Sequence, residues 1–261
     1  MRAAGLDRTE GRLFQAESFF YESTLGLPVA IVAAVIIRSR RAGLGVALVA
    51  LLVAAALWPV RPWYERPTTA HGPALRSAAT NAYLFNDDLD AYVAALGDLD
   101  ADVLVVHEST QAHVDALDGL DADTYPYEWS TAGDFSAKSH TVRSRYPIRA
   151  VTEDLVGARI YPTITIDVDG VLVDVVSVHA SAVLANDQTA RLRDELARVD
   201  DIARRAIDAG RPVIVAGDFN ASHEHTPFRD LLDGPLVDAH LARGQGLAAT
   251  WPARSLLPPI V

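Results

Sequence analysis

The chain contains no cysteine, and this absence excludes several kinds of chemistry. Disulfide bonds, thiol nucleophiles and cysteine-ligated metal sites are ruled out. Internal repeats and low-complexity tracts are also absent from the 261 residues. The lack of cysteine does not by itself indicate the compartment in which the chain works.

Positive charge is scarce over most of the chain. Residues 68–261 contain 15 Lys and Arg against 29 Asp and Glu, which gives a net charge of −14, and the whole chain carries −11. An acidic surface of this kind repels polyanions at long range. We therefore do not expect nonspecific binding to long duplex DNA, although a metal ion would still attract a single phosphate.

Long apolar runs are confined to residues 27–60. The segment Val46–Val60 is apolar on every face and approaches the length of a bilayer span, roughly 20 residues. The shorter run Leu27–Ile37 reaches spanning length only if residues 19–25 are added to it. The sequence thus predicts a membrane anchor over residues 1–60 with one or two transmembrane helices.

One alternative to an anchor is a buried helix of a soluble protein, although the segment is apolar on every face. The other is a secretory signal peptide. Against it, the strongly apolar segment begins more than 40 residues from Met1, and no clear cleavage site follows Trp58. Basic residues favour the cytoplasmic side of a membrane. Three arginines within residues 38–41 precede the segment and two, Arg61 and Arg66, follow it. We therefore expect the chain in the cell membrane, with its large domain outside the cytoplasm.

Residues 61–74 are rich in proline and read as a linker, and residues 75–261 form the large domain. Within it, short apolar runs predict strands, and apolar residues at helical spacing predict helices. The expected strands are 75–80, 102–106, 138–142, 163–168, 171–178 and 213–216, and the expected helices are 87–96 and 187–209. Asp169-Gly170 is a hairpin signal, so the sheet is at least partly antiparallel.

Polar side chains follow several of these apolar strands directly. Asn81 ends the first, Glu108 follows ADVLVVH, and His179 ends VVSVH. Asp218 and Asn220 follow the strand PVIVAG. Polar groups collected at the ends of several strands are hard to explain by folding alone and indicate an active site.

These residue types suit phosphate-ester chemistry. Carboxylate and amide oxygens are preferred ligands of Mg²⁺, which takes one or two protein carboxylates and keeps several waters. Such an ion neutralises a phosphoryl oxygen and stabilises a leaving oxygen. An aspartate can orient or deprotonate the attacking water, and a histidine can donate a hydrogen bond to the growing charge. The set fits metal-dependent hydrolysis of a phosphate ester.

At this point the chain resembles the endonuclease/exonuclease/phosphatase superfamily, which has the deoxyribonuclease I-like fold. The matching pieces occur in the family's order over residues 75–261. They are Asn81, VLVVHE ending at Glu108, SRYPI at 144–148, SVHAS with His179, GDFN with Asp218 and Asn220, LVDAH at 236–240 and TWPA at 250–253. The apolar amino-terminal segment is similar to that of the bacterial membrane-anchored branch.

The resemblance implies an α/β fold, a four-layer sandwich of two mixed β-sheets flanked by helices. It also implies roles for the matching residues. Glu108, with help from Asn81, would bind Mg²⁺ or Mn²⁺. Asp218 would orient or activate the nucleophilic water, Asn220 would position the phosphate or Asp218, and His179 would stabilise the transition state. The expected substrate is a phosphate ester in a nucleic acid, a phospholipid headgroup or a small molecule, and no protein partner is evident.

One departure from the family pattern concerns its last motif, an Asp-His pair on a final strand. No Asp is followed by His in this sequence; Asp238 is followed by Ala239 before His240. One expectation is that the chain is truncated before this motif and lacks its strand. The alternative is a noncatalytic phosphate-binding or scaffold member of the same fold.

Each candidate residue also has a purely structural interpretation. His179 would be a strand-end histidine with satisfied hydrogen bonds, and Glu108 would be a carboxylate favoured by a helix dipole. Asp218 and Asn220 would form a turn. Asn81 is the weakest candidate, because the strand register is uncertain and another asparagine lies nearby.

Further histidines invite a functional interpretation as well. The run His223-Glu224-His225 suggests a metal site, but sequence neighbours do not converge on one ion without a tight bend. We expect it to be a solvated helix start. His107 should point away from Glu108 on a strand and belong to the core or its rim.

Overall fold

The computed structural model describes residues 44–48, 50–51, 54, 74–119, 123–133, 137–184, 188–243 and 250. The predicted anchor over residues 1–60 lies almost wholly outside this part of the chain, and the linker over residues 61–74 lies outside it except for its last residue. Within the described residues, no helix is both long and apolar enough to cross a membrane. The anchor therefore stays a prediction.

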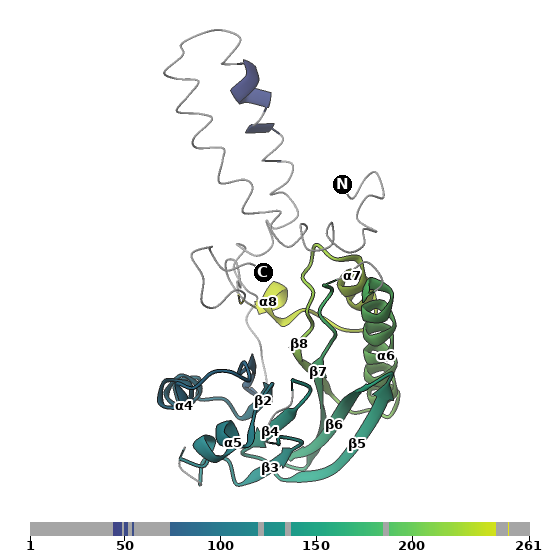
Figure 1. The fold of residues 1–261 in the computed structure, drawn as a ribbon. Coiled ribbons are helices and arrows are strands. Elements are labelled where there is room, and N and C mark those ends of the chain that lie inside the picture. Colours follow the sequence, from purple (N-terminus) through teal and green to yellow (C-terminus); the bar gives the residue numbers. More distant parts are fainter. Residues whose placement is uncertain are drawn as a thin grey trace.

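The described strands form two four-stranded sheets (Figure 1). The first sheet has the order β1-β2-β4-β3, with β1 Ser77–Asn81, β2 Val103–His107, β3 Tyr127–Ser130 and β4 His140–Ser144. The second has the order β5-β6-β7-β8, with β5 Ile148–Val156, β6 Arg159–Val168, β7 Val171–His179 and β8 Val213–Asp218. The pairs β1/β2 and β7/β8 are parallel and the others antiparallel, so both sheets are mixed as predicted.

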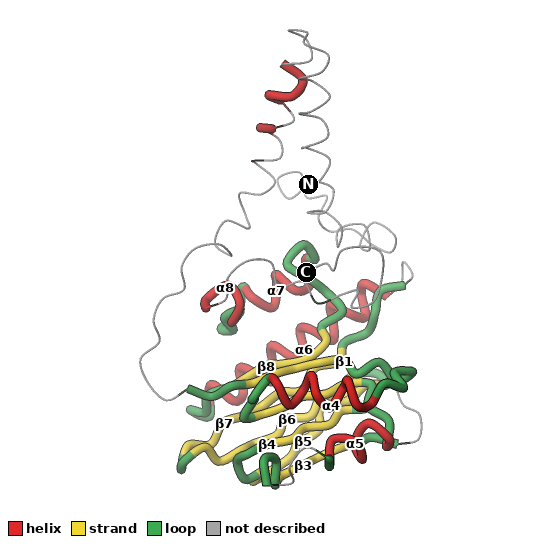
Figure 2. Tube along the Cα trace, turned by 90° about the vertical axis from the view of Figure 1, so that its left-hand side faces the viewer, coloured by secondary structure: helices red, strands yellow, loops and turns green. Residues whose placement is uncertain are grey.

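Helices cover the outer faces of the two sheets, so the described part of the chain has four layers (Figures 1 and 2). The helices are α4 Leu89–Asp98, α5 Gln111–Leu117, α6 Gln188–Asp208, α7 Thr226–Leu232 and α8 Ala239–Arg243. The pair α4 and α5 lies against the first sheet, and α6 and α7 lie on the side of the second. This arrangement matches the predicted four-layer sandwich.

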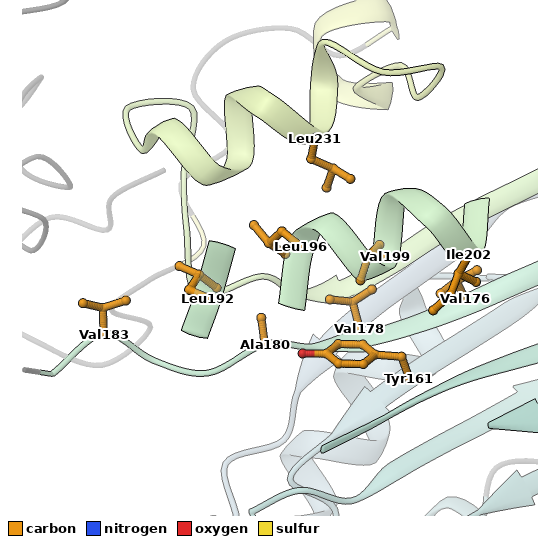
Figure 3. Close-up of a cluster of buried hydrophobic side chains, with 10 residues drawn as sticks. All are labelled: Tyr161, Val176, Val178, Ala180, Val183, Leu192, Leu196, Val199, Ile202 and Leu231. Carbon is orange, nitrogen blue, oxygen red and sulfur yellow. The ribbon is translucent and has the colours of Figure 1, made fainter. Parts of the chain in front are cut away.

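Three apolar clusters hold the layers together. Alternation along β2 places Leu104 and Val106 in the cluster under α4 and α5, and Val103 and Val105 in the cluster between the sheets. The third cluster packs α6 on the second sheet (Figure 3). Burial of each large aliphatic side chain stabilises the fold by about 1.5–3 kcal/mol. The apolar residues that alternate along the strands therefore hold the layers together.

Local sequence explains most element boundaries. Helix α4 begins two residues later than predicted, because Asp88 caps it by accepting a hydrogen bond from the Ala91 backbone N–H. The turn Asp169-Gly170 has positive φ at both residues, 53° and 90°, as a two-residue hairpin requires. The prediction of that hairpin is confirmed.

Several strand predictions need correction. The strand expected at residues 138–142 runs from His140 to Ser144, because it pairs antiparallel with β2 over that range. Strands β3 and β5 were not predicted, because their residues are only partly buried or exposed and show no clear alternation. Strand β6 begins at Arg159, four residues before its predicted start, because it pairs with β5 along that stretch.

Candidate active site

The parallel pairs of the two sheets bring the predicted site residues to one edge. In the register of the first sheet Asn81 lies opposite His107, directly before Glu108. In the second sheet His179 lies opposite Asp218. The carboxyl ends of parallel strands meet at the same edge of a sheet, so four strand ends from two sheets converge here.

Asn81 joins the two sheets at this edge. Its Nδ2 donates hydrogen bonds to Glu108 Oε1 at 2.9 Å and to Asp218 Oδ2 at 3.1 Å. Its Oδ1 accepts a hydrogen bond from the Tyr83 backbone N–H at 2.9 Å. The amide nitrogen therefore faces both carboxylates in this arrangement, and Asn81 positions them. Its role as a metal ligand stays a prediction.

Glu108 and His179 approach each other across the gap between the sheets. His179 Nε2 lies 3.6 Å from Glu108 Oε1, and the Glu108 side chain is 18% exposed. Glu108 has a positive φ of 54°, a conformation that costs a residue with a Cβ of order 1–3 kcal/mol. Strain of this kind is tolerated where the surrounding structure fixes the residue. The positive φ turns the Glu108 carboxylate out of the strand.

The turn after β8 holds Asp218 from both sides. Asp218 Oδ1 accepts a hydrogen bond from the Asn220 backbone N–H at 2.9 Å, while Oδ2 accepts from Asn81. Asn220 Nδ2 donates to the Ala180 carbonyl at 2.9 Å, which ties the turn to the end of β7. The turn predicted at Asp218 and Asn220 is therefore present, and Asn220 positions Asp218 through its main chain.

His179 is almost completely buried. Burial lowers its pKa, and the neighbouring carboxylates of Asp218 and Glu108 oppose that shift without reversing it. Its imidazole is therefore mainly neutral at neutral pH. Its Nδ1 has no hydrogen-bond partner among the described residues. The ring is held by packing, and Nε2 is the nitrogen directed at the carboxylate cluster.

The donor set fits a hard divalent cation that keeps most of its waters. Among the described side chains, no three His, Asp or Glu are arranged to hold an ion by themselves. Mg²⁺ commonly binds through only one or two carboxylates. Glu108 and Asp218 lie on either side of one amide group, and a cation beside them would offset the repulsion between two neighbouring carboxylates.

A buried polar group that the sequence did not predict lies directly beneath the site. His140 Nδ1 and His107 Nε2 both contact Ser177 Oγ, at 2.8 and 3.0 Å. His107 was predicted to belong to the core or rim, and it lies in the core between the sheets. Ser177 lies two residues before His179, and that spacing on a strand was the available signal.

The run from His223 to His225 is not the solvated helix start that the sequence predicts. His225 is buried rather than solvated and accepts a hydrogen bond from the Ser222 backbone N–H at 2.9 Å, just before α7. His223 Nε2 lies 2.8 Å from Asp238 Oδ2. These residues form a tight turn into a helix, so their side chains point to different partners and do not converge.

Acid should destabilise the fold through His140. Burial, with the nearby His179 and Arg159, lowers the pKa of His140 to about 3, whereas an unfolded histidine titrates near 6.5. The unfolded chain therefore binds a proton first as the pH falls below 6.5, and stability decreases. We expect the titration of His140 alone to lower the free energy of unfolding by about 2–3 kcal/mol between pH 7 and pH 4.5.

Urea unfolding at pH 7 and pH 4.5 measures this effect. The His140→Asn variant should lose less stability than the wild type over the same interval. Equal losses in both proteins would show that His140 does not stay neutral in the folded state. His107 faces the same serine and keeps its own acid sensitivity in the variant, because burial holds its pKa well below the ordinary value.

The chain is similar to known proteins in sequence pattern and in fold. The model of the Endonuclease/Exonuclease/phosphatase family matches residues 78–259. No curated protein matches the chain. Among solved structures, truncated TDP2 of Caenorhabditis elegans aligns with a TM-score of 0.50 and 13% identity, over 57% of this chain and 64% of that one.

Two further structures share the fold. Humanized TDP2 of D. rerio has a TM-score of 0.50 and 15% identity, over 60% of this chain and 66% of that one. Sphingomyelinase C from Streptomyces griseocarneus has a TM-score of 0.51 and 23% identity, over 64% of this chain and 72% of that one. The chain thus spans slightly less than two thirds of the length of both TDP2 structures.

Proposed function

Since the chain belongs to the endonuclease/exonuclease/phosphatase family, we propose that it is a metal-dependent hydrolase of phosphate esters. The observation that carries this proposal is the pair of hydrogen bonds from Asn81 to Glu108 and Asp218, with His179 at 3.6 Å from Glu108. Two carboxylates and an imidazole from two different sheets meet at one edge, an arrangement that suits hydrolysis of a phosphate ester.

Each residue has a task that its contacts support. Asp218 keeps a fixed carboxylate, held by Asn81 and by the Asn220 N–H, and it orients the attacking water or takes its proton. His179 donates a hydrogen bond from Nε2 to the phosphoryl oxygen on which charge builds. Glu108 would hold Mg²⁺ or Mn²⁺, with Asn81 beside it. The bound ion supplies charge neutralisation at the phosphoryl and leaving oxygens.

The charge of the domain limits the substrate. Its net charge of −14 over residues 68–261 repels long nucleic acids, so we propose phospholipid headgroups or small phosphate esters as substrates. We also propose that the domain works on the extracytoplasmic side of the membrane, on the basis of the arginines before the apolar segment at Val46–Val60.

The alternative is a noncatalytic member that binds phosphate groups without turnover. It is favoured by the lack of an Asp-His pair anywhere in the sequence. The two candidates differ in one measurable property, since both bind phosphate and only the hydrolase releases product.

Hydrolysis by the full-length chain tests the proposal. Purified in mild detergent and freed of metal with EDTA, it should be inactive on bis(p-nitrophenyl) phosphate and glycerophosphocholine. Addition of Mg²⁺ or Mn²⁺ should restore at least a 100-fold increase over the metal-free rate, as expected of a Lewis acid worth several kcal/mol. Saturable binding of inorganic phosphate with no product in either metal would favour the noncatalytic alternative.

A further inference from the structure

A single hydroxyl group connects the two sheets beneath the candidate site. Ser177 on β7 places its Oγ 3.0 Å from His107 Nε2 and 2.8 Å from His140 Nδ1. The two histidines lie opposite each other on β2 and β4 of the other sheet. All three side chains are at most 2% exposed. One buried hydrogen-bonded group thus joins two strands of the first sheet to one strand of the second.

The polarity of this group is unusual for its place in the fold. The buried apolar cluster between the sheets consists mainly of aliphatic side chains such as Val105, Val142 and Ile164. Buried polar groups cost free energy unless they are hydrogen-bonded, and aliphatic residues of similar size would hold two sheets together as well. Hydrogen bonds differ from aliphatic contacts in fixing direction and distance, so this group is suited to setting a geometry.

The three side chains have matching hydrogen-bonding groups. A neutral imidazole has one donor and one acceptor nitrogen, and a serine hydroxyl donates one bond and accepts others. Ser177 can therefore donate to one ring and accept from the other. Its hydroxyl group then has a partner for both hydrogen bonds, and each bond has a fixed direction.

The bridge touches three of the four strand ends that meet at the candidate site. His107 directly precedes Glu108, and Ser177 lies two residues before His179 on the same face of β7. The His107 ring also packs against the main chain of Gly217, which directly precedes Asp218. A Cβ at position 217 would lie 2.6 Å from Cε1 of His107. The three strand ends are thus located relative to one another through this group.

We propose that Ser177, His107 and His140 are positioning residues that set the separation of Glu108 from His179 and Asp218 across the two sheets. This inference rests on the proposed function for its catalytic consequence. The three side chains act through their neighbours, since they are buried and reach neither substrate nor solvent. Loss of the bridge lets the sheets shift by a fraction of an ångström, and displacements of about 1 Å cost up to 100-fold in rate.

The test compares variants that break the bridge with one that preserves it. Ser177→Ala and His140→Leu remove it, whereas His140→Asn keeps a polar atom near the place of Nδ1. Tyr125→Phe is the matched control, because it removes one buried hydrogen bond, from Tyr125 Oη to the Ala101 carbonyl, at the other end of β2. Each full-length variant is assayed for kcat, KM, Mn²⁺ affinity and urea unfolding.

We expect Ser177→Ala and His140→Leu to lower kcat about 10- to 100-fold and to weaken Mn²⁺ binding, with KM changed less than 3-fold. His140→Asn should recover most of both losses. Tyr125→Phe should reduce stability to a similar extent and leave kcat and Mn²⁺ affinity within 2-fold of wild type. If Ser177→Ala does not fold, His107→Gln and His107→Leu form the equivalent pair.

The outcomes separate this inference from the proposed function. If the bridge variants keep wild-type kcat and Mn²⁺ affinity while losing stability, the bridge is only structural and the inference is wrong. If the wild type binds Mn²⁺ without turnover and the variants bind it more weakly, the positioning role stands and hydrolysis fails. A wild type that neither binds Mn²⁺ nor hydrolyses any ester contradicts both.

Discussion

Replacement of Glu108 by glutamine should lower kcat/KM for bis(p-nitrophenyl) phosphate by about 1000-fold or more in saturating Mg²⁺. The change keeps the shape of the side chain and removes the charge that would hold the cation. Loss of one preorganised electrostatic group at a reaction centre typically costs 10²–10³ in rate, and loss of metal affinity adds to it. The free energy of unfolding should change little, because the side chain is partly exposed.

The control for this prediction is Glu153→Gln on β5, which removes the same charge from an exposed position. It should leave kcat/KM within 2-fold of wild type. A Glu108→Gln variant with wild-type activity and unchanged Mg²⁺ dependence would remove Glu108 from the site. Recovery of part of the activity at high Mn²⁺ would indicate that the main loss is in metal binding.

Replacement of Gly217 by alanine should cost more stability than alanine at the other positive-φ glycines, Gly157, Gly170 and Gly210. Gly217 has a φ of 146°, and a Cβ there would lie 1.9 Å from the Val178 carbonyl oxygen and 2.6 Å from the His107 ring. Neither neighbour can yield easily, since one is main chain in a paired strand and the other is a buried ring. We expect a cost above about 4 kcal/mol, in the range of severe core mutations.

Gly157→Ala is the matched comparison. Gly157 also has a positive φ, 61°, but a Cβ there would meet nothing within 4 Å. Its cost should be only about 1–2 kcal/mol, from backbone conformation alone. Urea unfolding of both variants measures the difference. Similar free energies of unfolding for the two variants would show that β7 and β8 lie farther apart at Gly217 than in this structure.

The sequence predicted the strand ends because their pattern is local. Each of Glu108, His179 and Asp218 comes at the end of a short apolar run, and apolar runs of that length predict strands. The helix α6 was predicted within a residue at each end for the same reason, since its apolar residues repeat at helical spacing. Family resemblance then supplied what local pattern cannot, the assembly of two sheets.

What the sequence did not reveal depends on contacts between distant residues. Nothing local marks His140 as a partner of Ser177, because 37 positions separate them and each looks like an ordinary strand residue. The orientation of the Asn81 amide is likewise decided by the Tyr83 backbone N–H and by two carboxylates from other strands. Such features require the register between sheets, which strand patterns alone do not fix.

In the function that we propose, the carboxylate and imidazole cluster at the strand ends is a metal-dependent hydrolytic centre. The most direct test titrates Mn²⁺ into the metal-free, full-length chain while bound metal is followed by electron paramagnetic resonance and bis(p-nitrophenyl) phosphate hydrolysis is followed by absorbance. We predict that the rate rises in proportion to one tight site per chain, and that Glu108→Gln loses both signals. Turnover that is independent of metal, or a filled site in a folded chain with no turnover, would contradict the claim.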